Sequence, residues 1–600
     1  MAGVTKTQGP LSVRAHVGDA KTLLAFDLDE SATNDLAGFT VQVAPPGVEP
    51  YYLLNELQFK TPTDHAQDAT VPPNSSINAP IHKFRWLHVP GSSHQGLTPV
   101  FGKYQYTVTP RYFDARGSLK PLDPTLGLAI QVEVGPFSKK GLAVGFTRGF
   151  TQSQAFVRHF GLKALIRPKG KQLLFDTTVE SGVNARGQHY TYDDEYEWLG
   201  FTARERILEI LHEVVSNKNL RLDVFAYDLN EPNVIEILIG LAKQGRVRII
   251  LDNAALHHGT PAKPEDQFEK LFRAAAKPPG EVLRGKFGRY SHGKVFVVSD
   301  ADGARRVLTG STNLSVTGLY VNSNHVLVFD DPKVAAKYAE VFEESWNDKA
   351  AAGKFRKSPL SQGTFSFSSA SVPATDISFS PHDAPVANAI LDALVQRIQR
   401  EGSKSKSVGS VLFAVMQMDV GTGPVFPALR TLHATKDIFS FGISDSPGGI
   451  FLYRPRSTRG VLVTGKPVNT QLPPPFNQVP GVGLGHQVHH KFVVCGFSGP
   501  DPVVYCGSSN LAALGEGANG DNLLAIHDGD VATVFAIEAL ALVDHFDFLD
   551  RSSAGPNSKK TASKQGAAVK AGWFLSTDGK WARPYYDPKD LRSVDRRLFA

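Results

Sequence analysis

The chain has 600 residues, of which 42% are hydrophobic and 20% charged, and a formal net charge of +6. This composition is typical of a soluble protein with three or four domains. No stretch reaches the ~20 apolar residues of a membrane-spanning helix, and residues 1–20 contain no apolar run of the kind that a signal peptide requires. The sequence therefore predicts a cytoplasmic protein, with secretion by a route that needs no amino-terminal signal left open.

Residues 1–148 show the two-residue alternation of β-strands. Segments 103–109 and 128–134 alternate apolar and polar side chains, and Gly, Pro and Asp separate them from their neighbours. Several short strands at this spacing favour a β-sandwich of immunoglobulin or fibronectin III type. No pattern of catalytic residues occurs in this segment.

From about residue 200 the pattern changes to alternating helices and strands. A β-α-β order with crossovers of this length predicts parallel strands. The histidines at 257 and 258 follow the strand at 247–251, where ligands bind in α/β sheets, so they are either rim residues or exposed loop residues. The predicted elements are a helix over 204–217, a strand over 222–227, a helix over 233–244 and strands over 247–251, 294–298 and 306–308.

The same order of elements occurs a second time after residue 384. Residues 354–373 are rich in Ser, Lys and Gly and are typical of a linker. The acidic and aromatic run at 190–198 either shapes a substrate cleft or packs one domain against another. The second set comprises a helix over 385–400, a strand over 411–417, a helix over 425–434 and a strand over 438–443.

The last fifty residues carry eleven Lys and Arg against four Asp. Such a tail can contact anionic lipid or nucleic acid through nonspecific attraction. The alternative is a solvated linker over 552–571 followed by a docked terminal segment. The aromatic residues that would anchor this segment are Trp573, Phe574, Trp581, Tyr585 and Tyr586.

The two cysteines, Cys495 and Cys506, flank a predicted hairpin whose turn lies near residues 497–501. Pairing around this turn sets Cys506 opposite Lys491, so the two sulfurs should lie too far apart to bridge. Unbridged thiols are typical of a cytoplasmic protein.

Two segments that are 197 residues apart carry the same polar motif without a gap. An internal duplication of this kind implies two halves that contribute equivalent side chains to one shared site. The first copy reads His292-Gly293-Lys294, Gly310-Ser311-Thr312-Asn313 and Asn322. The second reads His489-His490-Lys491, Gly507-Ser508-Ser509-Asn510 and Asn519.

These residue types match the needs of phosphodiester cleavage. Two lysines, two asparagines and the hydroxyls of Ser311 and Ser508 would donate to the non-bridging oxygens as charge builds in a five-coordinate transition state. One histidine would attack phosphorus to give a phosphohistidine, and the other would protonate the leaving oxygen and later activate water. The lysines supply positive charge, so neither a metal nor another cofactor is expected. A zinc site at His489, His490 and Cys495 is not expected, because the spacing fits no usual array and Lys491 would repel a cation.

The duplicated His-x-Lys and Gly-Ser-x-Asn residues resemble the phospholipase D superfamily over roughly residues 200–550. The resemblance implies an α/β fold with two pseudo-symmetric repeats that share one active site, preceded here by the β-sandwich. It implies a metal-independent phosphodiesterase, a hydrolase that acts through phosphohistidine. The implied segments are a sandwich at 1–148, a first repeat at 149–355, a linker at 356–384, a second repeat at 385–550 and a basic tail at 551–600.

Two departures from the family pattern distinguish the halves. The Asp that usually follows each His by seven residues is replaced by Ser299 and Gly496, as in the tyrosyl-DNA phosphodiesterase branch. The acid eleven residues after the motif Asn is present as Asp521 in the second copy and replaced by Asn324 in the first.

In the family, the acid of one half orients the histidine of the other. The resemblance therefore implies that Asp521 holds His292, the nucleophile, and that Asn324 faces His489, the general acid and base.

Three functions stay open for this motif set. Hydrolysis or transfer on phospholipids is favoured, because family members with two unequal halves in one chain include phospholipases and phosphatidyl-transferring enzymes. A nuclease or DNA-end-processing phosphodiesterase is the alternative, supported by the two missing acids and the basic tail. The third is a non-catalytic binding or scaffold protein, which the complete motif pairs oppose.

Overall fold

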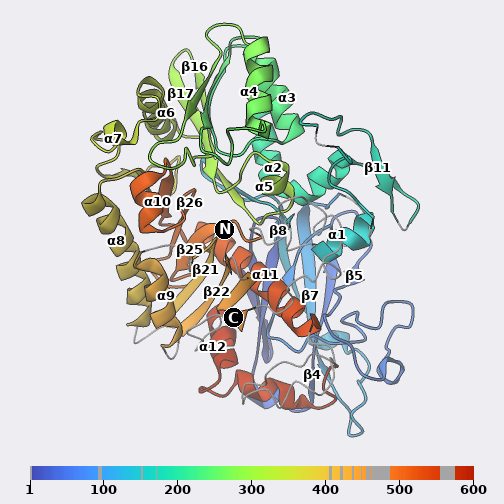
Figure 1. Cartoon of the computed structure of the whole chain (residues 1–600). Helices are drawn as coiled ribbons and strands as arrows, with labels where there is room; N and C mark the ends of the chain where they lie inside the picture. The colour runs from blue at the N-terminus through green and yellow to red at the C-terminus, as the bar shows by residue number, and fades with distance from the viewer. Residues whose placement is uncertain are drawn as a thin grey trace.

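Two large mixed sheets with one strand order form the centre of the computed structural model (Figure 1). The structure describes residues 3–91, 98–149, 153–161, 163–170, 172–184, 186–403, 409–418, 423–435, 438–446, 449–453, 461–462, 487–553 and 574–600. In sheet order, the first large sheet contains β15 (Glu281–Gly285), β14 (Val247–Asp252), β13 (Arg221–Ala226), β16 (Val295–Asp300), β17 (Gly303–Gly310), β18 (His325–Phe329), β10 (Leu142–Phe146) and β9 (Ser138–Lys139).

The second large sheet repeats this arrangement in the later part of the chain. Its strands β22, β21, β25, β26, β27, β20 and β19 follow the order of β14, β13, β16, β17, β18, β10 and β9. The pairs β13–β14 and β21–β22 are parallel, as predicted for β-α-β units, whereas their other neighbours in these two series pair antiparallel. The strands are β19 (Thr364–Phe367), β20 (Thr375–Phe379), β27 (Asn522–Ile526), β26 (Val503–Gly507), β25 (Lys491–Cys495), β21 (Gly409–Val415), β22 (Ile438–Ser446), β23 (Gly449–Tyr453) and β24 (Val461–Leu462).

Two predicted boundaries differ from the structure. Strands β9 and β10 lie before residue 148, but β10 pairs with β18 and β9 pairs with β10, so both belong to the first large sheet rather than to the N-terminal region. Strands β19 and β20 lie within the predicted linker at 356–384, where β20 pairs with β27 and β19 pairs with β20. The sequence pattern missed both because each segment finds its partner far away in the chain, and no local turn signal marks that pairing.

Helices cover the faces of both sheets. Predicted and observed helices agree closely. The α2 helix is broken at Phe201, whose φ of +46° is not helical, and the predicted helix over 204–217 corresponds to the part after this break. The part before it begins at Tyr192, where Thr191 and Asp194 form a capping box. The α3 helix begins with a proline and is capped by Glu231, whose carboxylate accepts from Val234 N. The helices are α1 (Ser153–Phe160), α2 (Tyr192–Ser216), α3 (Pro232–Ala242), α4 (Pro264–Ala275), α5 (Val316–Tyr320), α6 (Pro332–Asn347), α7 (Ala352–Phe355), α8 (Ala384–Gly402), α9 (Val425–His433), α10 (Ala513–Ala518), α11 (Gly529–Ser553) and α12 (Leu591–Phe599).

The N-terminal region contains two four-stranded antiparallel sheets whose apolar faces share one core cluster. In the strand at 128–134 every second residue is buried, as its alternation predicts. One sheet contains β1 (Val4–Gln8), β2 (Leu11–Val17), β3 (Thr22–Leu28) and β6 (Arg85–His88). The other contains β5 (Tyr51–Tyr52), β4 (Leu36–Ala44), β7 (Gly102–Tyr112) and β8 (Leu128–Val134). A separate hairpin is formed by β11 (Glu180–Val183) and β12 (His189–Thr191).

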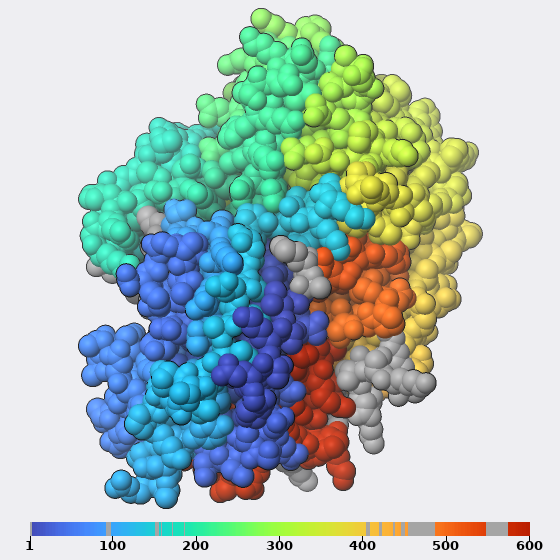
Figure 2. All heavy atoms as spheres, turned by 180° about the vertical axis from the view of Figure 1, so that it is seen from behind, coloured from blue at the N-terminus to red at the C-terminus, as the bar shows by residue number. Residues whose placement is uncertain are grey.

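The end of the chain is docked against the N-terminal sheets, which Figure 2 shows as red atoms beside blue ones. Trp581 Nε1 donates to Leu36 O at 2.7 Å, and Tyr585 lies in the N-terminal core. Arg85 of β6 pairs with Asp544 of α11 at 2.8 Å and with Asp595 of α12 at 3.0 Å. Of the two interpretations of the tail, a docked segment therefore holds for residues 574–600, and Trp573 lies outside the described residues.

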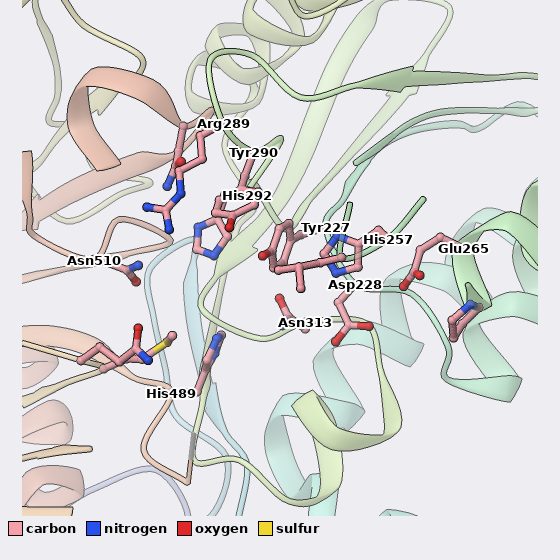
Figure 3. Close-up of a pocket in the computed structure, with 15 residues that line it drawn as sticks. Tyr227, Asp228, His257, Glu265, Arg289, Tyr290, His292, Asn313, His489 and Asn510 are labelled. Carbon is pink, nitrogen blue, oxygen red and sulfur yellow. The ribbon is translucent and has the colours of Figure 1, made fainter. Parts of the chain in front are cut away.

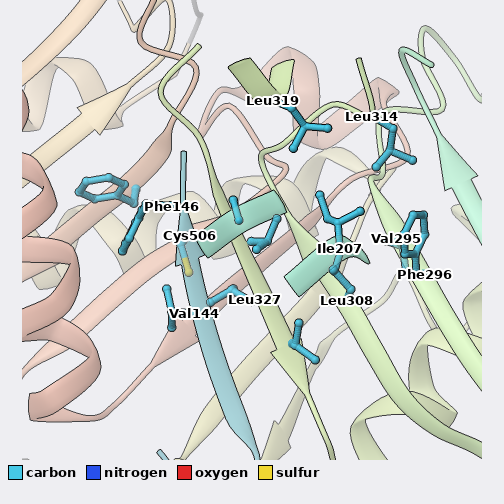
Figure 4. Close-up of a cluster of buried hydrophobic side chains, with 14 of the residues drawn as sticks. Val144, Phe146, Ile207, Val295, Phe296, Leu308, Leu314, Leu319, Leu327 and Cys506 are labelled. Carbon is cyan, nitrogen blue, oxygen red and sulfur yellow. The ribbon is translucent and has the colours of Figure 1, made fainter. Parts of the chain in front are cut away.

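One continuous apolar core joins the two large sheets, and Figure 4 shows part of it around Val144, Leu327 and Cys506. Cys495 lies in a different cluster, and both thiols are free. The hairpin register differs by one residue from the prediction. Val493 pairs with Tyr505, which aligns Cys506 with residue 492, because the loop spans residues 496–502. Among the described residues, no helix is long and apolar enough to cross a membrane.

Candidate active site

Both copies of the motif lie at the same position in their sheets. His292 precedes β16 and Asn313 follows β17, and these two strands are antiparallel neighbours, so their motif ends meet at one sheet edge. His489 and Asn510 stand in the same relation to β25 and β26. The hairpin plan therefore brings the histidine and asparagine of each copy together.

Backbone hydrogen bonds join the two motif edges across the molecule. Ser323 N donates to Gln487 O at 2.9 Å, and Gly520 N donates to Tyr290 O at 2.9 Å. These two bonds are equivalent under the 197-residue offset, so each half holds the segment before the other half's histidine. A further bond from His489 N to Ser323 O, at 3.1 Å, fixes the second histidine directly against the first half.

A cavity of about 470 Å³ lies where the two edges meet (Figure 3). His292, Asn313, His489, Asn510 and Asn519 all line it, although 197 residues separate the two copies. The remaining lining residues are Tyr227, Asp228, Leu256, His257, Pro264, Glu265, Arg289, Tyr290, Met416 and Gln417.

His292 is held by the carboxylate of the opposite half. Its Nδ1 lies 2.7 Å from Asp521 Oδ1, and both side chains are buried. Burial lowers the pKa of His292 to about 4 against the opposing effect of Asp521. Burial would raise the pKa of Asp521, but His292, Lys294 and Ser508 hold it below its ordinary value. At neutral pH a neutral His292 therefore donates from Nδ1 to an ionised Asp521, which leaves Nε2 with a free lone pair.

His489 is held by a neutral amide in the equivalent place. Its Nδ1 lies 2.8 Å from Asn324 Oδ1 and 3.1 Å from Ser311 O. Asn324 donates from Nδ2 to Gly318 O at 2.8 Å and accepts from Ser311 Oγ at 2.8 Å, which fixes Oδ1 as its acceptor. Two acceptors around Nδ1 favour the tautomer that carries the proton there.

The two lysines are buried without a carboxylate within ion-pair distance in the described part of the chain. Lys294 Nζ donates to His292 O, and Lys491 Nζ donates to His489 O at 2.7 Å. Burial lowers the pKa of Lys294 to about 7. Burial and the charge of Lys294 hold the pKa of Lys491 well below its ordinary value. A buried cation without a counter-ion is costly, so both lysines are suited to a bound anion.

The asparagines leave hydrogen-bonding capacity in the cavity. The Oδ1 atoms of Asn313, Asn510 and Asn519 are buried and have no hydrogen-bond partner among the described residues. Folding normally pairs buried polar atoms, so unpaired amides that line a cavity indicate groups reserved for a ligand.

The two motif serines differ from the expected phosphate donors. Ser311 and Ser508 are fully buried and do not line the cavity. Ser311 Oγ donates to Asn324, and Ser508 hydrogen-bonds Asp521. The two hydroxyls therefore position the residues that orient the histidines, because the glycine before each serine turns its side chain behind the cavity wall.

The structure accounts for one of the missing family acids. Gly496 has φ of +68°, a conformation that side chains rarely adopt. A Cβ there would lie 2.8 Å from Nη2 of Arg397, a residue whose Nη1 pairs with Glu401 at 2.6 Å. A buried Arg–Glu pair thus occupies the space that an aspartate would need. Ser299, at the equivalent place, lies within β16 and pairs with Arg221 of β13.

Sequence reasoning missed several cavity residues that only one half contributes. Tyr227 and Asp228 follow β13, Glu265 lies in the first turn of α4, and Arg289 precedes the first motif. The only sequence signal was their place after parallel strands, the same signal that marked His257 as a rim candidate. His257 does line the cavity, whereas His258 is exposed and bonds to Asp266 at 2.6 Å.

The run at 190–198 contributes mainly to packing. Tyr190, Tyr196 and Trp198 are buried in the main core cluster. Tyr196 also stacks on Tyr320 with ring centroids 3.8 Å apart. None of these residues lines the cavity.

Among the described residues, the side chains that could together hold a metal ion are an Asp-His-Glu group at one end of the cavity. Asp228, His257 and Glu265 offer ligand atoms within 4.8 Å of one another. Burial and the nearby Asp228 raise the pKa of Glu265 to about 7. The two motif histidines, His292 and His489, belong to no such group among the described residues.

Comparisons with known proteins agree with the duplicated motifs. Residues 212–346 match the family model described as cardiolipin synthase, PLD-like domain. Mitochondrial cardiolipin hydrolase from Chlamydomonas reinhardtii is 28% identical over 127 residues, which cover 21% of this chain and 51% of that protein. The chain therefore spans about half the length of this curated relative.

Solved structures resemble the chain with low TM-scores. The phospholipase D family member Nuc from Salmonella typhimurium is 23% identical, with 24% of this chain and 86% of that chain covered and a TM-score of 0.20. Phosphatidylserine synthase from Haemophilus influenzae Rd KW20 is 10% identical, with 57% and 84% covered and a TM-score of 0.36. The paired motifs, the matching family model and the curated relative identify the chain as a member of the phospholipase D superfamily.

Proposed function

We propose that the chain is a phosphodiesterase that cleaves phospholipids through a covalent phosphohistidine at a site shared by two repeats. The observation that carries this proposal is the convergence of His292 and His489 on one cavity, each followed two residues later by a buried lysine that has no carboxylate partner among the described residues. A phosphodiester anion would supply the counter-charge for Lys294 and Lys491. The side-chain amides of Asn313 and Asn510 line the cavity and would donate from Nδ2 to its non-bridging oxygens.

The first step joins phosphorus to His292. The neutral imidazole attacks through Nε2, and its Nδ1–H remains bonded to Asp521, which stabilises the positive charge that develops on the ring. The bond from phosphorus to the leaving oxygen breaks as a His489 imidazolium, which carries protons on both Nδ1 and Nε2, gives its Nε2 proton to that oxygen. The products are a phosphohistidine, the released alcohol and a neutral His489.

The second step returns the enzyme to its starting state. His489 Nε2 takes a proton from water, and the water oxygen attacks phosphorus. The phosphorus–nitrogen bond breaks, which frees His292 and the phosphate monoester. An alcohol in place of water would give transfer instead of hydrolysis.

The different partners of the two histidines support this division of roles. An ionised carboxylate stabilises the imidazolium that a nucleophilic histidine becomes when phosphorus is attached. The neutral Asn324 orients His489 without holding a positive charge on it, so this histidine can lose its proton readily. The asymmetry therefore favours His292 as the nucleophile.

A phospholipid is the favoured substrate. The matching family model and the curated relative both carry cardiolipin in their descriptions. Leu256 lines the cavity with 61% of its surface exposed, an apolar contact that an acyl-bearing substrate could use. The basic terminal segment is docked, which leaves less support for a free nucleic-acid-binding arm. A cytoplasmic location stays a prediction.

The test compares substrates and variants under one condition. Vesicles of phosphatidylcholine and of cardiolipin are incubated with the full chain in EDTA, and released headgroup or phosphatidic acid is measured, with single-stranded DNA as a parallel substrate. We expect lipid cleavage that is lost in His292→Ala and His489→Ala and kept in His189→Ala, whose histidine is exposed. Cleavage of DNA alone would replace the lipid assignment with a nuclease. No turnover of either substrate would contradict the proposal.

A further inference from the structure

Three side chains from one half of the molecule converge at the end of the cavity away from Asn510 (Figure 3). Asp228 follows β13, His257 lies in the loop after β14, and Glu265 lies in the first turn of α4. Each offers one ligand atom, and these atoms lie within 4.8 Å of one another. Val425 and Arg454 stand at the positions offset by 197 from Asp228 and His257, so this group is not part of the duplicated motif.

Glu265 has an unused oxygen in this group. The residue is 1% exposed, and one carboxylate oxygen, Oε1, accepts from Leu229 N at 3.0 Å. The other, Oε2, is buried and has no hydrogen-bond partner among the described residues. A buried carboxylate oxygen without a donor is costly, so its position indicates that a ligand pairs with it.

His257 is oriented as a ligand by a second carboxylate. Its Nδ1 lies 2.9 Å from Asp252 Oδ2, and Asp252 is fixed by bonds from Ala254 N and Ser291 N at 2.9 and 2.7 Å. A proton on Nδ1 leaves the Nε2 lone pair available to the group. This carboxylate–histidine pair is the outer-shell arrangement that orients histidine ligands in metal sites.

Asp228 completes the set from a fixed position. Its Oδ2 accepts from Ser315 Oγ at 2.7 Å, so the carboxylate is held by a helix cap rather than by a cation. No ion pair joins Asp228 or Glu265 to a lysine or arginine within the described residues. Two carboxylates therefore face each other beside one imidazole, and neither carboxylate is paired with a lysine or arginine among the described residues.

We propose that Asp228, His257 and Glu265 form a binding site for a divalent transition-metal cation such as Mn²⁺ or Zn²⁺. Two carboxylates favour a hard divalent ion, and the imidazole favours a transition metal over Mg²⁺ or Ca²⁺. Three protein ligands leave coordination positions free, and because all three residues line the cavity, those positions face it.

The cation site is separate from the reacting phosphorus. The Tyr227 ring stands between the two, with its centroid 4.4 Å from that of His257 and 4.6 Å from that of His292. The cation would bind a second anionic or hydroxyl group of a molecule in the cavity and would leave the histidine chemistry unchanged. The site thus depends on its own three residues and not on the proposed reaction.

The experiment measures cation binding without turnover. The full chain is stripped with EDTA, dialysed and titrated with Mn²⁺ under electron paramagnetic resonance detection, with Zn²⁺ measured in parallel by equilibrium dialysis. We expect about one equivalent bound by the wild type, and a ~10- to 100-fold weaker affinity in Glu265→Gln and His257→Ala. Nitrogen coupling to bound Mn²⁺ should be present in the wild type and absent in His257→Ala.

The neighbouring His258→Ala is the matched control and should bind as the wild type does, because the exposed His258 bonds to Asp266 of α4 and is not a member of the Asp-His-Glu group. The conservative Glu265→Gln keeps the acceptor for Leu229 N, so its melting temperature without metal checks that the fold is intact. The proposal is overturned if the wild type binds neither cation, or if both variants bind as tightly as the wild type. Loss of lipid cleavage would not affect this result.

Discussion

Replacing Lys294 by Met should stabilise the protein while it abolishes phosphate binding. Lys294 is 2% exposed, and burial lowers its pKa from 10.5 to about 7. At about 1.4 kcal/mol per pKa unit, this shift corresponds to a charge penalty of about 5 kcal/mol. Met has a similar volume, and the lost hydrogen bond to His292 O subtracts about 1 kcal/mol. We therefore expect the variant to be more stable at pH 7 by at least about 2 kcal/mol.

The lowered pKa of Lys294 also determines how the stability of the wild type changes with pH. Between pH 7 and about 10.5 the unfolded chain binds the Lys294 proton and the folded chain does not, so wild-type stability rises with pH in this window. The penalty is full below pH 7 and vanishes near pH 10.5. The advantage of Lys294→Met should therefore be largest at pH 6 to 7 and shrink steadily towards pH 10.

Urea unfolding at pH 6, 7, 8, 9 and 10 measures the difference between the two proteins. The exposed Lys286 provides the control, since Lys286→Met should change stability by less than about 0.5 kcal/mol at every pH. Inorganic phosphate should raise the urea midpoint of the wild type and leave that of Lys294→Met unchanged. A variant that is less stable than the wild type, or a difference that does not vary with pH, would refute the account of Lys294 as a buried cation awaiting an anion.

Three further predictions concern the partners of the histidines, the pH profile and the domain contacts. Asp521→Asn should lower kcat for lipid cleavage by about 10²- to 10⁴-fold in single-turnover assays, with slower formation of the phosphohistidine; an unchanged rate would remove Asp521 from the mechanism. The value of kcat/KM should fall as the pH rises above about 7, because the free enzyme loses the Lys294 proton there; a flat profile to pH 9 would contradict this assignment. Arg85→Ala should lower the free energy of unfolding by about 3 to 5 kcal/mol, because it removes the guanidinium that pairs with both Asp544 and Asp595, whereas Lys83→Ala breaks a surface pair and should cost less than about 1 kcal/mol.

The duplication allowed much of the site to be predicted from the sequence. Equal spacing of His292 and His489, and of their lysines and asparagines, indicated which residues meet before any contact was known. The pairing of Asp521 with His292 came from the family resemblance, and the structure places these two side chains 2.7 Å apart. Residues that act as pairs across the two halves are therefore the ones that sequence reasoning found.

The residues and strands that sequence reasoning missed are marked neither by the repeat nor by a local sequence signal. Asp228 and Glu265 come from one half alone, so no equivalent residue marked them. Ser311 and Ser508 were assigned by residue type, but their direction depends on how the strand ends turn at Gly310 and Gly507, both of which have positive φ. Strands β10 and β20 were missed because their partners, β18 and β27, lie far away in the chain.

The most direct test of the central claim identifies the residue that carries the covalent intermediate. The His489→Ala variant retains the nucleophile and lacks the group that activates water, so a phospholipid labelled with ³²P at the phosphate should leave label on the protein. An activated leaving group, such as p-nitrophenol, removes the need for His489 to protonate the departing oxygen. Peptide mapping should place the label on His292, and Asp521→Asn in the same background should slow its appearance. Label on any other residue would contradict the assignment of His292 as the nucleophile.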